Sequence, residues 1–259
     1  MPVADSHCHL DIMGGDVAAQ LHAARAVGID TVIQIGVDVE SSRLAATLAE
    51  EHESVWAAVA LHPNEAGRGM ATADALAEIA LLARLPQVKA IGETGLDHFR
   101  TGPEGQGLQK ESFRAHIRIA KDSGKTLVIH DRDAHDDVLR VLTDEGAPER
   151  VVFHCYSGDA AMARLCTDAG YYLSFAGPVT FKPNDALREA ATVCPQDRIL
   201  VETDAPFLTP MPFRGRPNAP YLIPLTVRAL AASRGDDLDQ LCGAIAANTR
   251  RAFGLPERV

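Results

Sequence analysis

Eight short runs rich in β-branched residues alternate with amphipathic stretches rich in alanine and leucine, and this alternation constrains the fold more than any other feature. We predict strands over residues 3–8, 31–36, 55–61, 88–92, 126–130, 151–154, 171–175 and 199–202. Helices are predicted over residues 16–27, 42–52, 73–83, 109–123, 134–145, 160–169, 184–193, 223–233 and 239–253. Strands separated by long helices pair in parallel through right-handed crossovers. Eight such units in 259 residues predict a closed (β/α)8 barrel, with an open doubly wound sheet as the alternative.

No linker rich in proline and serine divides the chain, so we predict a single domain over residues 1–259. The least regular segment is 206–224, which contains six prolines together with Arg214 and Arg216. We expect it to form a long loop over the C-terminal mouth of the barrel, where such loops often bear on function. The alternative is a rigid connector that only leads to the last helices.

The composition is that of a globular protein, with 46% hydrophobic and 23% charged residues and no apolar run approaching about 18 residues. The opening segment MPVADSHCHLD includes Asp5, Asp11 and two histidines, and it resembles neither a secretory signal nor a basic transit peptide. We therefore expect a cytoplasmic protein with no membrane segment. Five scattered cysteines without a CxxC pair argue against a disulfide framework and against a zinc ribbon.

The net charge of −10 disfavours a protein that wraps duplex nucleic acid with a broad basic surface. A bound divalent cation can reverse the sign of the local field, so the charge does not exclude phosphate binding at a metal site. A small or single-stranded substrate fits this charge better than duplex DNA does.

Five of the ten histidines fall at the ends of predicted strands, and two acidic residues do the same. His7 and His9 are two residues apart on the first strand, so their side chains leave the same face, whereas Cys8 faces the helices. The other five residues at strand ends are His62, Glu93, His130, His154 and Asp204. The C-terminal strand ends of a barrel converge on one mouth, so we expect these seven residues to form one polar cluster.

Imidazole and carboxylate donors in this number suit Zn²⁺ or Mn²⁺, and a shared carboxylate allows two metals to lie about 3.5–4 Å apart. Mg²⁺ prefers oxygen ligands and is less favoured, although it can also activate such a site. A lone histidine at a strand end is more often a packed side chain, so the metal prediction depends on the whole set. The remaining histidines are not predicted to bind metal, and they are His22, His52, His98, His116 and His135.

Six motifs occur in order along the chain, namely DSHCHLD, ALHPN, GETGLD, IHDRDA, FHCYSG and ETDAPFL. Together they resemble those of the TatD-type metal-dependent hydrolases over essentially the whole sequence. The resemblance implies a (β/α)8 barrel, dependence on divalent metals, and hydrolysis of phosphodiester bonds in DNA from the 3′ end of single strands.

The resemblance also implies roles for individual residues. One metal would be held by His7, His9, Glu93 and Asp204, and the second by Glu93, His130 and His154, with Glu93 bridging the two. His62 would contact the scissile phosphate and protonate the leaving group, and Asp204 would also orient or deprotonate the attacking water. Because one guanidinium group can donate two parallel hydrogen bonds to the oxygens of a phosphate, we expect Arg100, Arg214 and Arg216 to contact phosphate.

Two other functions use the same residues. A related barrel hydrolase could cleave an ester or amide, for example as an aminoacyl-tRNA deacylase. A protein that kept the barrel and lost catalysis would be a metal-binding adaptor, although such a protein would be expected to lack a ligand or His62, and all are present. We expect a monomer with no obligate protein partner, acting on single-stranded DNA or another phosphodiester.

Overall fold

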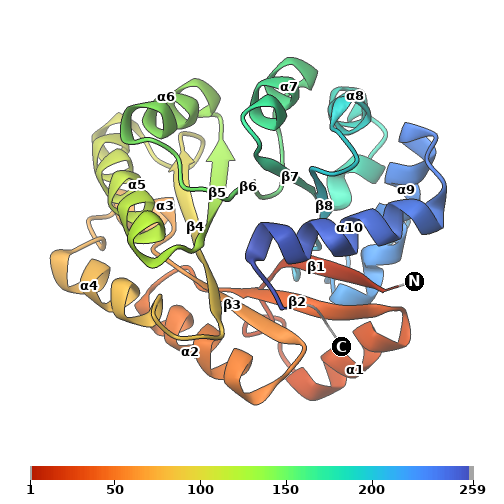
Figure 1. Ribbon diagram of the computed structural model, residues 1–259, viewed down its shortest axis with the longest axis horizontal. Coiled ribbons are helices and arrows are strands. Elements are labelled where there is room, and N and C mark those ends of the chain that lie inside the picture. Colours follow the sequence, from red (N-terminus) through yellow and green to blue (C-terminus); the bar gives the residue numbers. More distant parts are fainter. Residues whose placement is uncertain (1, 257–259) are drawn as a thin grey trace. The chain divides into compact units, whose positions relative to one another are not determined.

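The computed structural model describes residues 2–256, which fall into two compact units. The terminal unit runs up to Ile33 and resumes at His154, and the central unit is Gln34–Phe153. Eight strands alternate with helices and are ordered β1 to β8 in one sheet (Figure 1). This order and alternation confirm the predicted (β/α)8 barrel fold.

The central unit contains four strands and five helices between residues 34 and 153. They are α2 (Val39–Glu51), β3 (Val55–Val59), α3 (Pro63–Gly67), α4 (Ala73–Leu82), β4 (Val88–Asp97), α5 (Pro103–Ser123), β5 (Thr126–Arg132), α6 (His135–Glu145) and β6 (Val151–Phe153). The strands β3 to β6 pair in parallel in that order, and α5 lies along β4 (Figure 1).

The terminal unit combines segments from both ends of the chain. Its elements are β1 (Val3–Cys8), α1 (Val17–Ala26), β2 (Ile29–Ile35, the last part of which lies in the central unit), α7 (Ala160–Asp168), β7 (Tyr172–Phe175), η1 (Gly177–Thr180), α8 (Asp185–Val193), β8 (Ile199–Val201), η2 (Pro220–Leu222), α9 (Ile223–Arg234) and α10 (Leu238–Phe253). The strands β7 and β8 pair in parallel, and α10 contacts β1.

Helix starts follow local chemistry that is legible in the sequence. The side chain of Asp38 accepts a hydrogen bond from the backbone N–H of Ser41 at 2.7 Å, which begins α2 with a capping box. Asp159 caps α7 through one hydrogen bond, which its side chain accepts from the N–H of Met162 at 2.9 Å. Pro103 at the first position of α5 needs no hydrogen-bond acceptor, and this explains why α5 begins earlier than residue 109.

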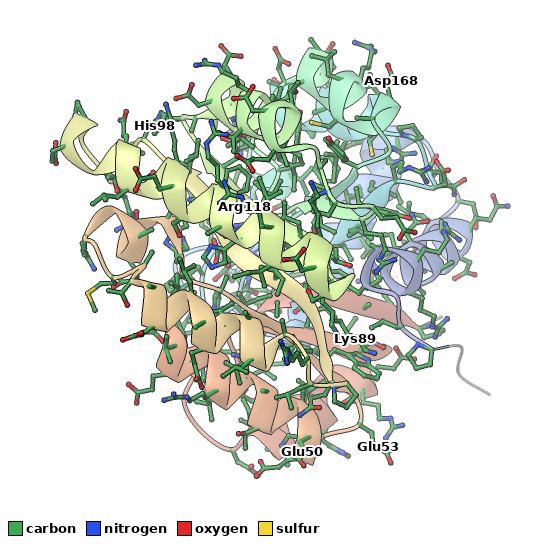
Figure 2. All side chains as sticks on the ribbon, turned by 60° about the vertical axis from the view of Figure 1, so that its left-hand side comes forward. Glu50, Glu53, Lys89, His98, Arg118 and Asp168 are labelled. Carbon is green, nitrogen blue, oxygen red and sulfur yellow. The ribbon has the colours of Figure 1, made fainter. Side chains whose placement is uncertain are left out.

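The helices α5 and α6 are joined on their outer side by ion pairs. Arg114 Nη1 lies 2.8 Å from Glu145 Oε1, and Arg118 Nε lies 3.2 Å from Glu145 Oε2. Arg118 is labelled in Figure 2, where its helix crosses the front of the view. Exposed pairs of this kind contribute little to stability, so burial of the strands must provide most of it.

The strands are buried along nearly their whole length, as expected for parallel strands that are covered on both faces. Two strands extend past their predicted ends at residues 92 and 130: β4 continues to Asp97, and β5 continues to Arg132. Gly95 is the reason that β4 and β5 can pair this far: its φ is +139°, and a Cβ at this position would lie 2.1 Å from the carbonyl oxygen of His130.

Segment 206–224 is irregular as predicted up to residue 219, and η2 and the start of α9 occupy the rest of it. The short helix α3, which follows β3, was not predicted. Within residues 2–256, no helix combines the length and the apolar character that a membrane crossing requires.

Candidate metal centre

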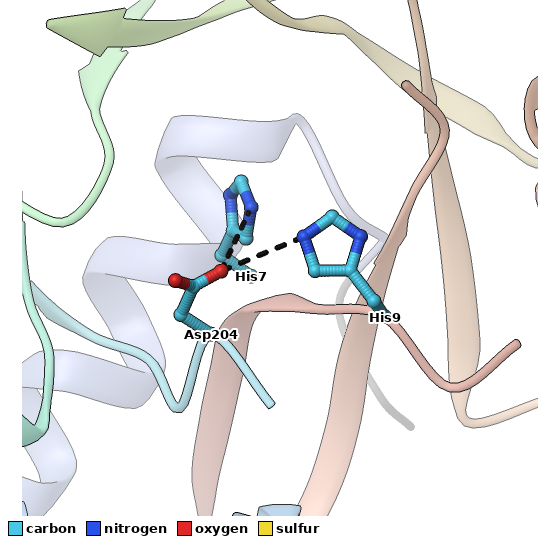
Figure 3. Close-up of side chains that lie close together, drawn as sticks. All are labelled: His7, His9 and Asp204. Carbon is cyan, nitrogen blue, oxygen red and sulfur yellow. Dashed lines mark ion pairs between the residues drawn. The ribbon is translucent and has the colours of Figure 1, made fainter. Parts of the chain in front are cut away.

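The first cluster of ligand side chains lies in the terminal unit, where β1 meets the segment after β8. Asp204 Oδ1 is 3.6 Å from His7 Nε2 and 3.5 Å from His9 Nε2 (Figure 3). The backbone fixes this arrangement, because the Asp204 N–H donates to the His7 carbonyl and the His9 N–H donates to the Ala205 carbonyl, both at 2.9 Å. The segments thus continue as parallel neighbours past the strand ends, and this pairing brings residues 7 and 204 together.

The Asp204 carboxyl is held in its charged form. Burial acts to raise its pKa, but a hydrogen bond with His9 and the charges of the neighbouring histidines outweigh burial, and the pKa is lowered. A deprotonated carboxylate is the form that binds a cation or accepts a proton. Asp204 is therefore suited to either role.

His154 belongs to the same cluster and follows β6. Its ring stacks on that of His7, with centroids 3.9 Å apart and an interplanar angle of 14°. Its Nδ1 lies 3.2 Å from Glu202 Oε1, which also accepts a hydrogen bond from the Cys155 N–H at 2.8 Å. An Nδ1–H that donates to this carboxylate would make Nε2 the metal-binding nitrogen of His154, as in many carboxylate–histidine–metal arrangements.

The second cluster lies in the central unit, where His62 follows β3, whereas Glu93 and His130 lie within β4 and β5 because these strands continue past their predicted ends. Glu93 Oε1 is 2.7 Å from His130 Nδ1 and 3.3 Å from His62 Nε2. His130 Nε2 lies 3.3 Å from Asp97 Oδ2, and Asp97 is almost fully buried. A hydrogen on Nε2 that is donated to Asp97 leaves Nδ1, which faces Glu93, as the metal-binding nitrogen of His130.

Asp97 is ionised and is held in place beside His130 by hydrogen bonds. Burial opposes its ionisation, yet hydrogen bonds with His130 and with the Arg100 N–H, together with the charges of His130 and Arg132, lower its pKa to about 2. The Arg100 N–H donates to Oδ1 at 2.8 Å, and the Asp97 N–H donates to the Gln109 side chain at 3.0 Å. Asp97 is therefore a fixed carboxylate at neutral pH.

His62 differs from His130, the other histidine of this cluster, in its hydrogen bonding. Its Nδ1 accepts the N–H of Asn64 at 3.0 Å, at the start of α3. A neutral His62 ring therefore carries its hydrogen on Nε2, the nitrogen that faces Glu93. An Nε2 that carries a hydrogen cannot bind a metal but can donate a hydrogen bond, so the geometry favours His62 as a hydrogen-bond donor over His62 as a ligand.

The residues present suit divalent cations. Within residues 2–256, three groups have ligand atoms within 4.8 Å of one another, namely His7 with His9 and Asp204, His7 with His154 and Glu202, and His62 with Glu93 and His130. Glu202 is fully buried, and its Oε2 has no hydrogen-bond partner among residues 2–256. A buried carboxylate oxygen left in this state is costly unless a cation or a hydrogen-bond donor satisfies it, so a cation beside His154 fits this site.

The structure brings the predicted ligands together within each unit. His7, His9, His154 and Asp204 meet in the terminal unit, and His62, Glu93 and His130 meet in the central unit. That Glu93 bridges two metals stays a prediction.

The three predicted phosphate-binding arginines are exposed. The guanidinium of Arg214 lies 4.4 Å from the ring centroid of Phe181, and that of Arg216 lies 5.8 Å from that of Phe213. Arg100 is held through its backbone by Asp97, and its side chain is exposed. Their contacts with phosphate stay predictions.

The other histidines lie apart from the two clusters. His116 is fully buried, and its Nε2 accepts the Leu61 N–H at 3.0 Å. His135 begins α6 as predicted, with its Nδ1 2.8 Å from Asp131. His98, labelled in Figure 2, faces Asp137 at 3.8 Å.

Two carboxylates of the site, Asp97 and Glu202, were missed by sequence reasoning. Each lies within hydrogen-bond distance of one imidazole nitrogen, and a hydrogen on that nitrogen would make the other nitrogen of the ring the one that binds a metal. Glu202 is two residues before Asp204, and this spacing at the end of a strand was the available signal. Asp97 had a weaker signal, because β4 was expected to end before it.

Comparison with known proteins agrees with this geometry. The family model described as TatD related DNase matches residues 4–254. The sequence is 45% identical to an uncharacterised metal-dependent hydrolase TatD from Mycobacterium tuberculosis, with 98% of each chain covered. It is 33% identical to the 3′-5′ ssDNA/RNA exonuclease TatD of Citrobacter rodentium, over 93% of this chain and 91% of that one. The crystal structure of the TatD homologue YJJV from Escherichia coli K12 superposes with a TM-score of 0.92 at 27% identity, covering 98% of both chains.

Proposed function

The chain belongs to the TatD-related DNase family, a family of metal-dependent hydrolases, and on this premise we propose that it is a 3′-5′ exonuclease of single-stranded DNA. The observation that carries the proposal is the pair of histidine–carboxylate clusters whose imidazoles are oriented by Asp97 and Glu202. The name of the Citrobacter rodentium relative supports the choice of substrate and polarity.

We assign the predicted ligands to two divalent metals, with Zn²⁺ or Mn²⁺ favoured by the histidine-rich set and Mg²⁺ as an alternative. The first metal would be held by His7, His9, Glu93 and Asp204, and the second by Glu93, His130 and His154. When bound, such metals lower the pKa of a water molecule and stabilise the charge that develops on a phosphate.

The remaining chemistry belongs to the side chains. Asp204, kept ionised by its neighbours, orients the attacking water and accepts its proton. His62 contacts the scissile phosphate by donating a hydrogen bond from Nε2, and it gives the Nε2 proton to the leaving oxygen when its ring carries a second proton. Arg100, Arg214 and Arg216 contact phosphate oxygens along the strand.

The deciding experiment combines elemental analysis with product mapping. Purified protein loaded with Zn²⁺, Mn²⁺ or Mg²⁺ is incubated with single-stranded DNA labelled at the 5′ end, with single-stranded RNA, and with aminoacyl esters. We expect a ladder of products that shortens from the 3′ end of the DNA, and its loss on addition of chelator. Metal-dependent turnover of the aminoacyl ester alone would show a deacylase, and two bound metals without any turnover would show a binding protein.

Glu93→Gln tests the bridging role. Removing the negative charge removes the group that offsets the repulsion between two cations, so we expect at least one metal and most of the activity to be lost. Glu65→Gln is the matched control, because Glu65 pairs with Arg68 on the exposed side of α3. Two metals and full turnover in Glu93→Gln would contradict the assignment.

We propose further that residues 1–259 act as one domain and as a monomer without an obligate partner. Light scattering of the metal-loaded protein should give a mass near 27.7 kDa. A mass of twice this value that persists on dilution would contradict the monomer.

A further inference from the structure

The loops that follow β7 and β8 carry basic and aromatic side chains and no acidic residue. They comprise residues 176–184 and 205–219, in a chain whose net charge is −10. We call the aromatic–basic surface the set formed by Phe181, Lys182, Phe207, Phe213, Arg214 and Arg216. All six residues belong to the terminal unit, which also contains the cluster of His7, His9 and Asp204.

The two loops are in direct contact. A Cβ at Gly177 would lie 1.9 Å from the carbonyl oxygen of Leu208, so only glycine allows this approach. The Met211 N–H donates to Thr180 Oγ1 at 2.8 Å, and the guanidinium of Arg214 covers the ring of Phe181. These contacts hold the two loops together, so that residues of both loops form one continuous surface.

Phe207 is the residue of this surface that lies beside the cluster of His7, His9 and Asp204. Its ring centroid is 6.3 Å from that of His9, edge to face at 70°, while 53% of the residue remains exposed. Its backbone is tightly held, because the Phe207 N–H donates to the Asp204 carbonyl at 2.8 Å. Buried Asn218 donates through Nδ2 to the Phe207 carbonyl at 2.7 Å and to the Thr203 carbonyl at 2.8 Å. An exposed phenyl ring is thus presented by a rigid backbone beside two of the proposed ligands.

We propose that Phe207 stacks on a base of single-stranded DNA and thereby positions the adjoining phosphodiester at the cluster of His7, His9 and Asp204. Every base has a π face, so stacking on an aromatic ring tolerates any sequence. Bases inside a duplex already stack on their neighbours, so the ring selects single strands. Arg214 and Arg216, which lie over Phe181 and Phe213, continue the surface for the next nucleotides. This inference rests on the proposed nuclease function, and it makes Phe207 a positioning residue.

The test combines a change in the protein with a change in the substrate. Phe207→Leu removes the aromatic face and keeps an apolar side chain, and Phe207→Tyr keeps the face. Tyr221→Leu is the control, because Tyr221 is an exposed aromatic residue of η2, which packs against α1. Each protein is assayed on a single-stranded oligonucleotide with a normal 3′-terminal nucleotide and on one with an abasic 3′ terminus.

We expect the parent protein, Phe207→Tyr and Tyr221→Leu to show a KM for the normal substrate that is about 5- to 100-fold below that for the abasic one. Phe207→Leu should lose most of this difference while its kcat on the abasic substrate and its metal content stay near those of the parent. An equal loss on both substrates would indicate general disruption of the site, and an unchanged preference would show that another group binds the base. Either result overturns the proposal.

A second measurement requires no metal and no turnover. In excess chelator, an oligonucleotide with 2-aminopurine at its 3′ end is titrated with each protein, and quenching of its fluorescence reports stacking. Quenching by the parent protein and by Phe207→Tyr, but not by Phe207→Leu, supports the inference even if no hydrolysis is found, in which case the nuclease function alone fails. Equal quenching by the parent and by Phe207→Leu, or none by either, overturns it.

Discussion

A hydrogen bond from His130 Nε2 to Asp97 would make Nδ1 the metal-binding nitrogen of His130, and asparagine at position 97 should reverse this arrangement. One carboxylate oxygen, Oδ1, accepts the Arg100 N–H at 2.8 Å, and the other, Oδ2, lies 3.3 Å from His130 Nε2. In Asp97→Asn the amide oxygen must stay toward the Arg100 N–H, because the NH₂ group cannot accept that hydrogen bond. The NH₂ then points at His130 and donates to Nε2, which moves the ring hydrogen to Nδ1, the nitrogen that faces Glu93.

The size of the effect follows from this geometry. An imidazole whose ligand nitrogen carries a hydrogen must change tautomer before that nitrogen can bind a metal. In the new tautomer, His130 Nε2 carries the hydrogen and faces the NH₂ group of the asparagine, so two donors face each other without an acceptor. Loss of the negative charge of Asp97 acts in the same direction, since its pKa of about 2 keeps it ionised at neutral pH. Substitution of such carboxylates lowers metal affinity about 10- to 100-fold, which corresponds to about 1.4–2.8 kcal/mol.

The assay is competition for Zn²⁺ against a fluorescent chelator of known affinity, with elemental analysis at saturation. Asp137→Asn is the matched control, because Asp137 also faces a histidine, His98, but pairs mainly with Lys110 at 2.6 Å. We expect weakened binding at one site in Asp97→Asn and unchanged binding in the control. Affinity within twofold of the parent at every site, together with full turnover, would refute the tautomer argument.

Further substitutions test other parts of the site and of the core. Glu202→Ala should lower metal affinity about tenfold or more by freeing the His154 ring, as measured by the same competition, and unchanged affinity would contradict this. Cys8→Ser should leave metal content unchanged, because the buried thiol contacts Met13 and belongs to neither cluster, whereas His7→Ala should reduce it. Burial lowers the pKa of His116 to about 4, below the ordinary 6.5, so the metal-free protein should be fully stabilised by this group above pH 6.5 and lose about 3 kcal/mol as pH falls to 4. Urea titrations should show a shallower pH dependence in His116→Gln, and identical profiles would exclude His116 as the cause.

The fold and the ligand types could be predicted from the sequence because both are carried by local patterns. Alternating strand and helix patterns leave few topologies open at this length, and parallel strands place their C-terminal residues at one edge. His7 and His9 could be assigned to one face of β1 from their spacing alone, since side chains alternate along a strand. The ends of β4 and β5 could not be predicted in this way. Both strands continue past the predicted ends because Gly95, which has no Cβ, allows their backbones to approach each other.

The orientation of the ligands was decided by the tertiary structure. The sequence by itself placed histidines and carboxylates in the C-terminal halves of the strands or just after them, but it carries no record of which nitrogen of each ring faces a carboxylate. That depends on contacts between residues far apart in the chain, such as His130 with Asp97 and His154 with Glu202. Phe207 shows the same limit, because its place beside His9 follows from the pairing of β1 with the segment after β8. Sequence patterns specify which groups are present, whereas hydrogen-bond partners are fixed only when distant segments pack together.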